Sequence, residues 1–248
     1  MLDLERQNAY RRRYAREHPG WQDSGPIYEA TVRRHLRPDT RLLDLGCGRG
    51  GLVELLHDRV ALAVGADPDL PSLREHRVPS LPRVVARAEA LPFASESFDL
   101  VTASWVLEHL TAPEQALAEI ARLLVPGGRF VFLTPNAHSL PALLNRLLGR
   151  MARLQRWLVA RLYGRVEADT FPVVYRANTP RTLRRLMQRA GLQYETLTFI
   201  GDPTYFAFNE LLYRLSCWLE ARIPQTMKVH LVGVGRRERQ APDPPPQP

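Results

Sequence analysis

The chain has 248 residues, which suits one large α/β domain or one such domain with an insertion. Hydrophobic residues make up 45% of it and charged residues 24%, a composition that excludes global disorder and predicts a packed core. The net charge is +8, and Lys228 is the only lysine. Because the arginines are spread along the chain, we interpret most of them as solvated positions, and we do not expect a nucleic-acid partner.

Other features of the sequence narrow the class of protein further. We find no apolar run long enough for a membrane-spanning helix, and the first twenty residues lack the apolar core of a signal peptide. Cys47 and Cys217 are far apart and show neither a metal-ligand spacing nor a disulfide framework, so we expect no metal. These observations predict a cytoplasmic protein.

The predicted elements begin with a charged helical segment over 1–37, broken at Pro19-Gly20. Short apolar strands and helices then alternate. Strands are expected over 42–48, 61–67, 83–88, 98–104 and 129–134, and helices over 51–58, 70–76 and 113–124. Pro126-Gly127-Gly128 is expected to end the last of these helices. This order predicts an α/β fold with a mostly parallel sheet covered by helices on both faces.

The regular alternation stops after the fifth strand, where we expect a helical insertion over 137–178. A helix over 180–190, with Thr179 as its N-cap, and strands over 193–200 and 227–234 complete the main domain, 38–240. Between those strands lies an amphipathic helix over 205–222. The proline-rich tail, 241–248, is predicted to be disordered.

A glycine-rich turn, Asp44-Leu45-Gly46-Cys47-Gly48-Arg49-Gly50, joins the first strand to the helix that follows it. Glycines there allow a tight turn and a close approach of the backbone to a ligand. The spacing is G-x-G-x-G, which departs from the dinucleotide fingerprint. Asp67 ends the second strand, where a carboxylate can accept hydrogen bonds from ribose hydroxyls. Together the turn and Asp67 predict a nucleoside site.

Five segments in order, LLDLGCGRGG, VGADPD, ARAEALPFASESFDLV, WVLEHL and LLVPGGRFVFLTPN, resemble the class I S-adenosylmethionine-dependent methyltransferases over about residues 40–136. The segment 170–192 is similar to a subgroup whose substrate is unassigned. The resemblance implies a Rossmann-like, seven-stranded sheet with its last strand antiparallel. It also implies S-adenosyl-L-methionine as cofactor and methyl transfer by in-line displacement.

The resemblance assigns cofactor contacts to positions on the carboxyl side of the first four strands. These are Asp44, Gly46, Cys47, Gly48, Gly50, Asp67, Pro68, Ala88, Glu89 and Ser104, with Trp105 beside the sulfur. Relatives commonly carry an acidic residue where this chain has Arg87. Arginine cannot accept a hydrogen bond from adenine, so that contact falls to the backbone of Ala88 and Glu89.

His109 is the candidate general base, because imidazole transfers protons near neutral pH and His109 follows the fourth strand. The alternative is that Glu108 and His109 only hold the loop that enters the next helix. Tyr175, Arg176 and Asn178 are candidate substrate contacts, with capping of the following helix as the alternative.

The acceptor is expected to be a small or lipid-like molecule. Leucines at helical spacing alternate with arginines over 139–163, and 205–222 repeats the apolar pattern. Both helices either cover the core or lie on an anionic membrane at its inner face. An RNA methyltransferase and a non-catalytic binding module of the same fold remain alternatives.

Overall fold

A computed structural model describes residues 4–149 and 173–238 of the chain. The N-terminal segment forms two helices, α1 (Leu4–Glu17) and α2 (Ser24–Arg33), on either side of Pro19-Gly20 as predicted. Asp23 caps α2 by accepting a hydrogen bond from the Ser24 N–H at 2.7 Å. In the described part of the chain, no helix has the length and apolar character needed to cross a bilayer.

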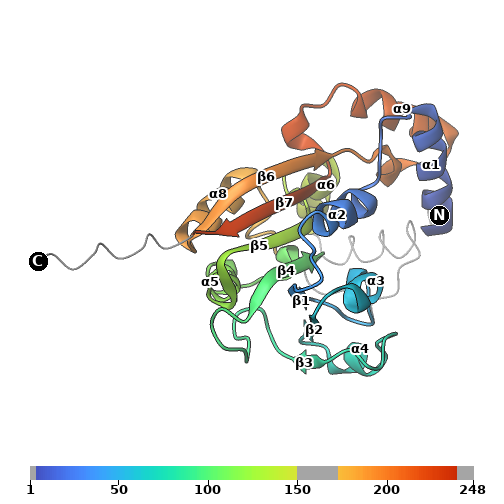
Figure 1. Cartoon of the computed structure of the whole chain (residues 1–248). Coiled ribbons are helices and arrows are strands. Elements are labelled where there is room, and N and C mark those ends of the chain that lie inside the picture. The colour runs from blue at the N-terminus through green and yellow to red at the C-terminus, as the bar shows by residue number, and fades with distance from the viewer. Residues whose placement is uncertain (1–3, 150–172, 239–248) are drawn as a thin grey trace, which may run out of the picture.

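Seven strands form one sheet in the order β3-β2-β1-β4-β5-β7-β6, which confirms the predicted Rossmann-like fold (Figure 1). Five neighbouring strands are parallel, and β7 runs antiparallel to both β5 and β6. The strands are β1 (Arg41–Leu45), β2 (Leu62–Asp67), β3 (Arg83–Val85), β4 (Phe98–Ser104), β5 (Leu124–Pro135), β6 (Leu192–Ile200) and β7 (His230–Arg237).

Alternating side chains along the strands build two cores, one on each face of the sheet. Leu43 of β1 packs in the core that includes helices α5 (Pro113–Leu123) and α8 (Pro180–Arg189). Leu42 faces the opposite core, with α2, α3 (Leu52–Leu56) and α4 (Leu70–Arg74). Helices cover both faces of the sheet, so a ligand reaches the sheet at the ends of its strands. The carboxyl ends of β1, β2 and β4 lie side by side and form such a place.

Several predicted boundaries are wrong. Strand β7 begins at His230 and ends at Arg237, three residues later at each end than predicted. Strand β5 begins at Leu124 and includes Pro126-Gly127-Gly128, because Leu124 already pairs with Phe98 before the register shifts. Strand β3 ends at Val85, three residues early. Helix α9 (Glu210–Glu220) starts late, because Pro203–Phe206 forms a separate 3-10 turn and Asn209 caps the helix by accepting from the Leu212 N–H at 2.9 Å.

The insertion begins as expected with a helix, α6 (Leu140–Gly149), directly after β5. The rest of the helix expected over 139–163, and the tail 241–248, lie outside the described residues. Thr179 caps α8 as predicted, with its hydroxyl accepting from the Thr182 N–H at 3.2 Å.

Candidate functional site

The glycine turn follows β1 at the carboxyl edge of the sheet. Gly46 and Gly48 have φ angles of 70° and 48°, a region that residues with a side chain rarely adopt. The Gly46 N–H donates to the Ala66 carbonyl at 2.8 Å, which fixes the turn against β2. A Cβ at Gly46 would lie 2.3 Å from the Cγ2 atom of Val106, so this position has no room for a side chain.

Asp67 ends β2 directly beside this turn. Its carboxylate accepts from the Gly48 N–H at 2.9 Å and from the Asp69 N–H at 2.8 Å. The structure therefore brings together the turn and the carboxylate, which the sequence places 19 residues apart. Pro68 follows at the exposed surface, in the loop to α4.

Asp44 lies at the carboxyl half of β1 and is buried. Its carboxylate accepts a hydrogen bond from the Thr102 hydroxyl at 2.7 Å, a neutral partner. Burial, followed by the charge of Asp67, raises the pKa of Asp44 to about 7 against the hydrogen bond from Thr102. Two carboxylates beside an open glycine turn fit a ligand that carries a sugar diol and a positive charge.

Cys47 and Gly50 take part in the turn in different ways. The Cys47 side chain is buried against Gly65, whose Cβ position lies 2.6 Å from the sulfur, so only the backbone of Cys47 is left to face a ligand. Burial also raises the pKa of that thiol to about 12. Gly50 has a φ of 133° and closes the turn through its N–H, which donates to the Cys47 carbonyl at 2.8 Å.

The segment after β3 carries the residues expected along the adenine edge. Arg87 pairs with Ala90 in an isolated antiparallel bridge, which folds this segment back on itself. The Arg87 guanidinium lies 3.4 Å from the Glu89 carboxylate and donates to the Thr111 hydroxyl at 3.3 Å. Arg87 is thus turned toward protein partners, and Ala88 lies half-buried between the paired residues.

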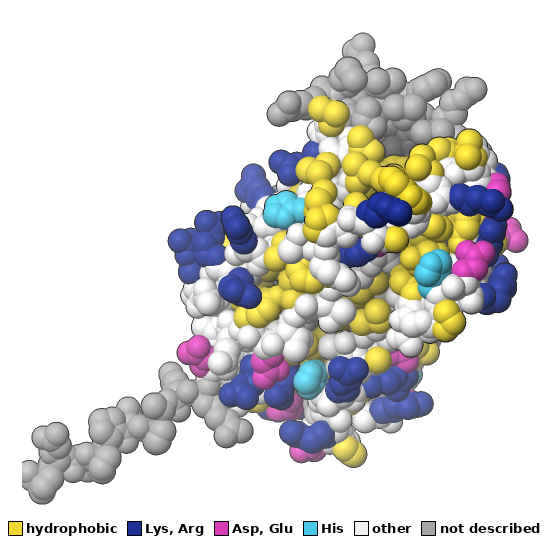
Figure 2. All heavy atoms as spheres, turned by 90° about the horizontal axis from the view of Figure 1, so that it is seen from above, with side chains coloured by type: hydrophobic (Ala, Val, Ile, Leu, Met, Phe, Trp, Pro, Cys, Tyr) yellow, Lys and Arg dark blue, Asp and Glu magenta, His cyan; other side chains and the backbone are white. Residues whose placement is uncertain are grey.

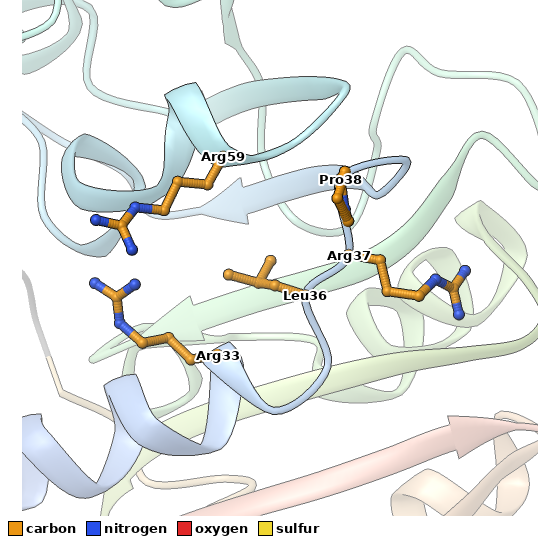
Figure 3. A pocket seen from close by; sticks show the side chains of 5 residues that line it. All are labelled: Arg33, Leu36, Arg37, Pro38 and Arg59. Atoms are coloured by element: carbon orange, nitrogen blue, oxygen red, sulfur yellow. The ribbon is translucent and has the colours of Figure 1, made fainter.

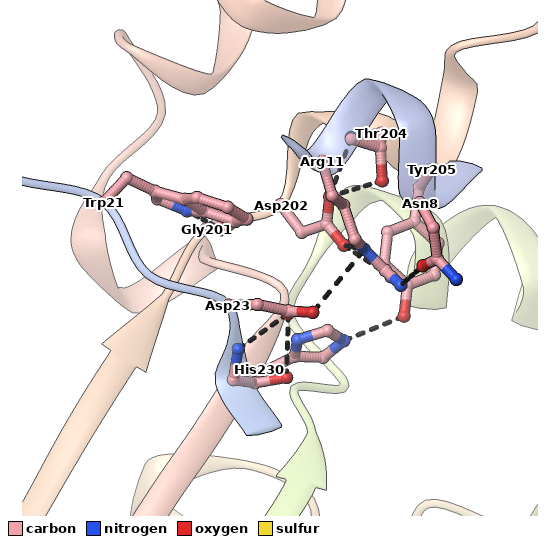
Figure 4. Close-up of polar contacts among 10 residues, drawn as sticks. Asn8, Arg11, Trp21, Asp23, Gly201, Asp202, Thr204, Tyr205 and His230 are labelled. Atoms are coloured by element: carbon pink, nitrogen blue, oxygen red, sulfur yellow. Dashed lines mark hydrogen bonds and ion pairs between the residues drawn. The ribbon is translucent and has the colours of Figure 1, made fainter. Parts of the chain in front are cut away.

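Ser104 ends β4, and Trp105 follows it with a φ of 59° and an exposed indole ring. The backbone N–H of Trp105 donates to the Leu133 carbonyl at 2.9 Å, which holds this strained backbone against β5. The indole meets the His230 ring edge to face, with centroids 4.9 Å apart. The Tyr205 hydroxyl hydrogen-bonds to Nε2 of His230 at 2.8 Å (Figure 4).

His230 and Tyr205 were missed from the sequence. His230 opens β7, where it pairs with Pro135 at the carboxyl end of β5, and burial lowers its pKa to about 4. No local motif marks it, because it reaches the site only when β7 inserts between β5 and β6.

An ion pair holds α1 over this corner (Figure 4). The Arg11 guanidinium donates twice to Asp202 Oδ2, at 2.9 and 2.7 Å, and the Asp202 side chain has no exposed area. The Trp21 indole N–H donates to the Gly201 carbonyl at 2.7 Å. These contacts hold the N-terminal segment against the loop that precedes Tyr205.

Glu108 and His109 lie in a 3-10 turn after β4. Glu108 is buried and accepts from the Thr134 hydroxyl at 3.1 Å, and burial raises its pKa. His109 is partly exposed, with its Nε2 atom 3.9 Å from the Glu108 carboxylate. Glu108 therefore anchors the turn, and the His109 side chain stays partly accessible.

The segment that starts at Val173 docks on this turn. The backbone N–H groups of Val174 and Tyr175 donate to the Glu108 carbonyl at 2.8 and 3.2 Å. Arg176 donates to the Thr111 carbonyl at 2.5 Å. Asn178 is fully buried, and its amide donates to the Thr134 hydroxyl and the Pro135 carbonyl. Arg176 and Asn178 thus hold the segment in place. Tyr175 has a φ of 52° and a half-buried side chain, and its contact with a substrate stays a prediction from the sequence.

A shallow hollow lies elsewhere, at the amino ends of β1 and β2 (Figure 3). It is lined by Arg33, Leu36, Arg37, Pro38 and Arg59. Arg33 and Arg37 are paired with Glu29 and Asp39, at 2.7 and 3.0 Å. The hollow lies at the amino ends of the strands, whereas the glycine turn lies at their carboxyl ends, so the hollow is separate from the site. Within residues 4–149 and 173–238, no group of three or more His, Cys, Asp or Glu side chains is placed to hold a metal ion.

Comparisons of the sequence point in one direction. The family described as "Methyltransferase domain" matches residues 43–132. The 2-phytyl-1,4-naphtoquinone methyltransferase of Thermosynechococcus vestitus is 36% identical over 163 residues, which cover 61% of this chain and 71% of the relative. The demethylmenaquinone methyltransferase of Mycobacterium sp. (strain KMS) is 38% identical over 123 residues, covering 47% of this chain and 54% of the relative. This second match spans about half the length of each protein.

Solved structures resemble the fold at lower sequence identity. Geranyl diphosphate C-methyltransferase from Streptomyces coelicolor superposes with a TM-score of 0.59 at 16% identity, over 86% of this chain and 77% of that one. The structure of a Haloferax volcanii putative methyltransferase with its Trm112 activator gives a TM-score of 0.59 at 20% identity, over 86% of this chain and 90% of that one. At these identities the likeness concerns the fold alone.

Proposed function

The chain belongs to the class I S-adenosylmethionine-dependent methyltransferases, and we propose that its acceptor is a prenylated aromatic molecule of the naphthoquinone type. S-adenosylmethionine is the methyl donor, and the acceptor is a small molecule. The observation that carries the finer proposal is the 36% identity to an enzyme named for a phytylated naphthoquinone, over 163 residues. The exposed indole of Trp105, beside the glycine turn and the buried carboxylates, supports it.

We assign the donor site to the turn and the two carboxylates. The glycine turn 46–50 offers backbone that a ligand can approach closely, and the Asp67 carboxylate can exchange its bonds to Gly48 and Asp69 for bonds to ribose hydroxyls. Asp44 offers a buried negative charge to the cationic amino-acid end. The backbone of Ala88 and Glu89 serves the adenine edge. When bound, S-adenosylmethionine supplies an electrophilic methyl group on a sulfonium.

The chemistry of the acceptor defines what the protein has to do. A quinone ring is electron-poor, so the form that reacts is its reduced, dihydroxy form. His109 accepts the proton of one ring hydroxyl, and the resulting phenolate makes the neighbouring ring carbon nucleophilic. That carbon would bond to the methyl group of the bound donor as the carbon–sulfur bond breaks. The proton displaced from the ring carbon would then leave to solvent, while the protonated His109 returns its proton to the ring oxygen. Trp105 stacks on the acceptor ring and Tyr175 borders it, which keeps the carbon in line.

The test is an anaerobic assay with S-adenosylmethionine and a short-chain prenylated dihydroxynaphthalene. We expect a product that has gained one methyl group on the ring, detected by mass spectrometry. Asp67→Ala should abolish donor binding in calorimetry. Trp105→Ala should raise the acceptor KM about tenfold and leave the donor Kd unchanged, whereas His109→Ala should lower kcat about a hundredfold.

Two results would count against the proposal in different ways. Normal donor binding without methylation of any dihydroxynaphthalene would remove the acceptor and leave the donor site intact. Normal donor binding by Asp67→Ala would remove the site assignment itself.

A further inference from the structure

Helix α9 exposes apolar side chains to solvent as well as burying some of its residues. Its inner face places Tyr213 in a small aromatic cluster and also buries polar groups: the Tyr213 hydroxyl donates to Glu17 at 2.9 Å, and Glu220 pairs with Lys228 at 2.6 Å. Its outer face carries a stripe of apolar side chains, with Leu211, Leu215 and Trp218 exposed at 76%, 48% and 52%, beside the exposed ion pair of Arg214 with Glu210. A helix covered only by water normally turns its apolar stripe inward. The outer face of α9 therefore has the character of a contact surface.

The C-terminal end of this stripe carries tryptophan and arginine. The Arg222 guanidinium lies over the Trp218 ring, 4.1 Å from its centroid, and donates to the Trp218 carbonyl at 3.0 Å. Within α9 the two acidic side chains are neutralised, Glu220 by Lys228 and Glu210 by arginines. Tryptophan and arginine flanking an apolar helix face are typical of helices that lie in a lipid–water interface.

Helix α6 presents a second apolar stripe near the same edge of the sheet. Its exposed leucines follow helical spacing and are Leu140, Leu143, Leu144 and Leu147. Helix α6 follows the carboxyl end of β5, and α9 follows the turn that places Tyr205 on His230, so both helices start from elements at this end of the sheet. Figure 2, seen from the side that carries α9 and α1 in Figure 1, shows hydrophobic side chains gathered there with Lys and Arg side chains among them.

We propose that the outer faces of α9 and α6 dock this protein on an anionic lipid bilayer, from which the acceptor enters the site. The inference rests on the proposed function, because a prenylated acceptor resides in lipid. Charge favours a bilayer over a second copy of the chain. The net charge is +8, so two copies of the chain repel each other at long range. Anionic headgroups would instead complement this positive charge.

The experiment is co-sedimentation of the full chain with vesicles, without donor or acceptor. We expect binding to phosphatidylglycerol–phosphatidylcholine vesicles that weakens in high salt, and much less binding to pure phosphatidylcholine. The double variant Leu211→Ser, Trp218→Ser should reduce binding at least about tenfold. Leu55→Ser on α3, which removes a leucine of 53% exposure from another face, is the matched control and should bind as wild type.

Other outcomes would overturn the inference. Absence of wild-type binding to anionic vesicles at low salt would do so, as would equal binding by the double variant. Circular dichroism verifies that the variant is folded. A dimer in sedimentation velocity that the double variant loses would assign the face to self-association. Vesicle binding needs no acceptor, so it can persist if the proposed acceptor fails. Conversely, methylation of a short-chain acceptor in detergent can persist in the variant that no longer binds vesicles.

Discussion

Asp44 is deeply buried, and among the described residues its carboxylate accepts a hydrogen bond from one neutral donor, Thr102. A charge buried in this way costs stability in the free protein, and a bound cation would offset that cost. The raised pKa of Asp44, about 7, expresses that cost. Asp67 differs, because two backbone N–H groups already hold its carboxylate in the free protein.

This difference leads to a prediction about stability and pH. The pKa of Asp44 is raised from 3.8 to about 7 on folding, so the folded protein holds this proton more tightly than the unfolded chain. The contribution of Asp44 to the free energy of unfolding is therefore fully present below about pH 4, where the carboxyl is protonated in both states. It is lost as the pH rises through 7, because the buried group then has to ionise. Asp44→Asn should stabilise the free protein at pH 8 by on the order of 2 kcal/mol, and the gain should shrink toward pH 5.

Urea unfolding of both proteins at pH 5, 6, 7 and 8 measures this difference. The same variant should lose most of the donor affinity that calorimetry detects for the wild type. A stability difference that does not change with pH would show that Asp44 does not carry a perturbed proton.

At the scale of elements, β7 shows how a strand is fitted between two others. A Cβ on Gly233 would lie 2.3 Å from the Phe132 ring, and one on Gly235 would lie 2.1 Å from the end of the Met187 side chain. Both glycines face the same core, but Phe132 is a rigid ring packed between strands, whereas Met187 is a flexible chain from α8.

The two positions therefore form a matched pair. Gly233→Ala should lower the free energy of unfolding by about 2 kcal/mol, since the ring has no space into which to move. Gly235→Ala should cost clearly less, because the Met187 methyl group can rotate away. Chemical denaturation of the two variants measures both values. Equal losses would mean that strand propensity, not packing against Phe132, decides the effect.

Most of these elements could be predicted from the sequence because their signals are local. Apolar runs marked the strands, and Thr179 marked the start of α8. The start of β5 was missed because Pro126-Gly127-Gly128 has the local character of a helix stop, while pairing of Leu124 with Phe98 depends on a neighbouring strand. The start of α9 was missed because Tyr205 and Phe206 fit the apolar pattern but belong to a 3-10 turn.

At the scale of the whole molecule, the site is closed by contacts between distant parts of the chain. Asp44, the glycine turn and Asp67 were predictable because motif spacing along adjacent strands determines them. His230 and Tyr205 were not, since the fold brings them to Trp105 from residues far along the sequence. The ion pair between Arg11 and Asp202 likewise joins positions 191 residues apart, and no local pattern identifies such a pair.

That ion pair should determine whether the N-terminal helix stays on the site. Arg11→Met would leave the Asp202 carboxylate buried with Thr204 as its one remaining donor in the described part of the chain, so we expect a loss of about 3 kcal/mol in the free energy of unfolding. Adding Asp202→Asn should restore part of it, because the buried charge is then removed. Arg13→Met breaks an exposed pair with Glu210 and should cost much less, because water screens that pair. If Arg11→Met and Arg13→Met proved equally mild in urea unfolding, α1 would be held by its aromatic contacts, such as Tyr10 on Tyr213, and not by the buried charge pair.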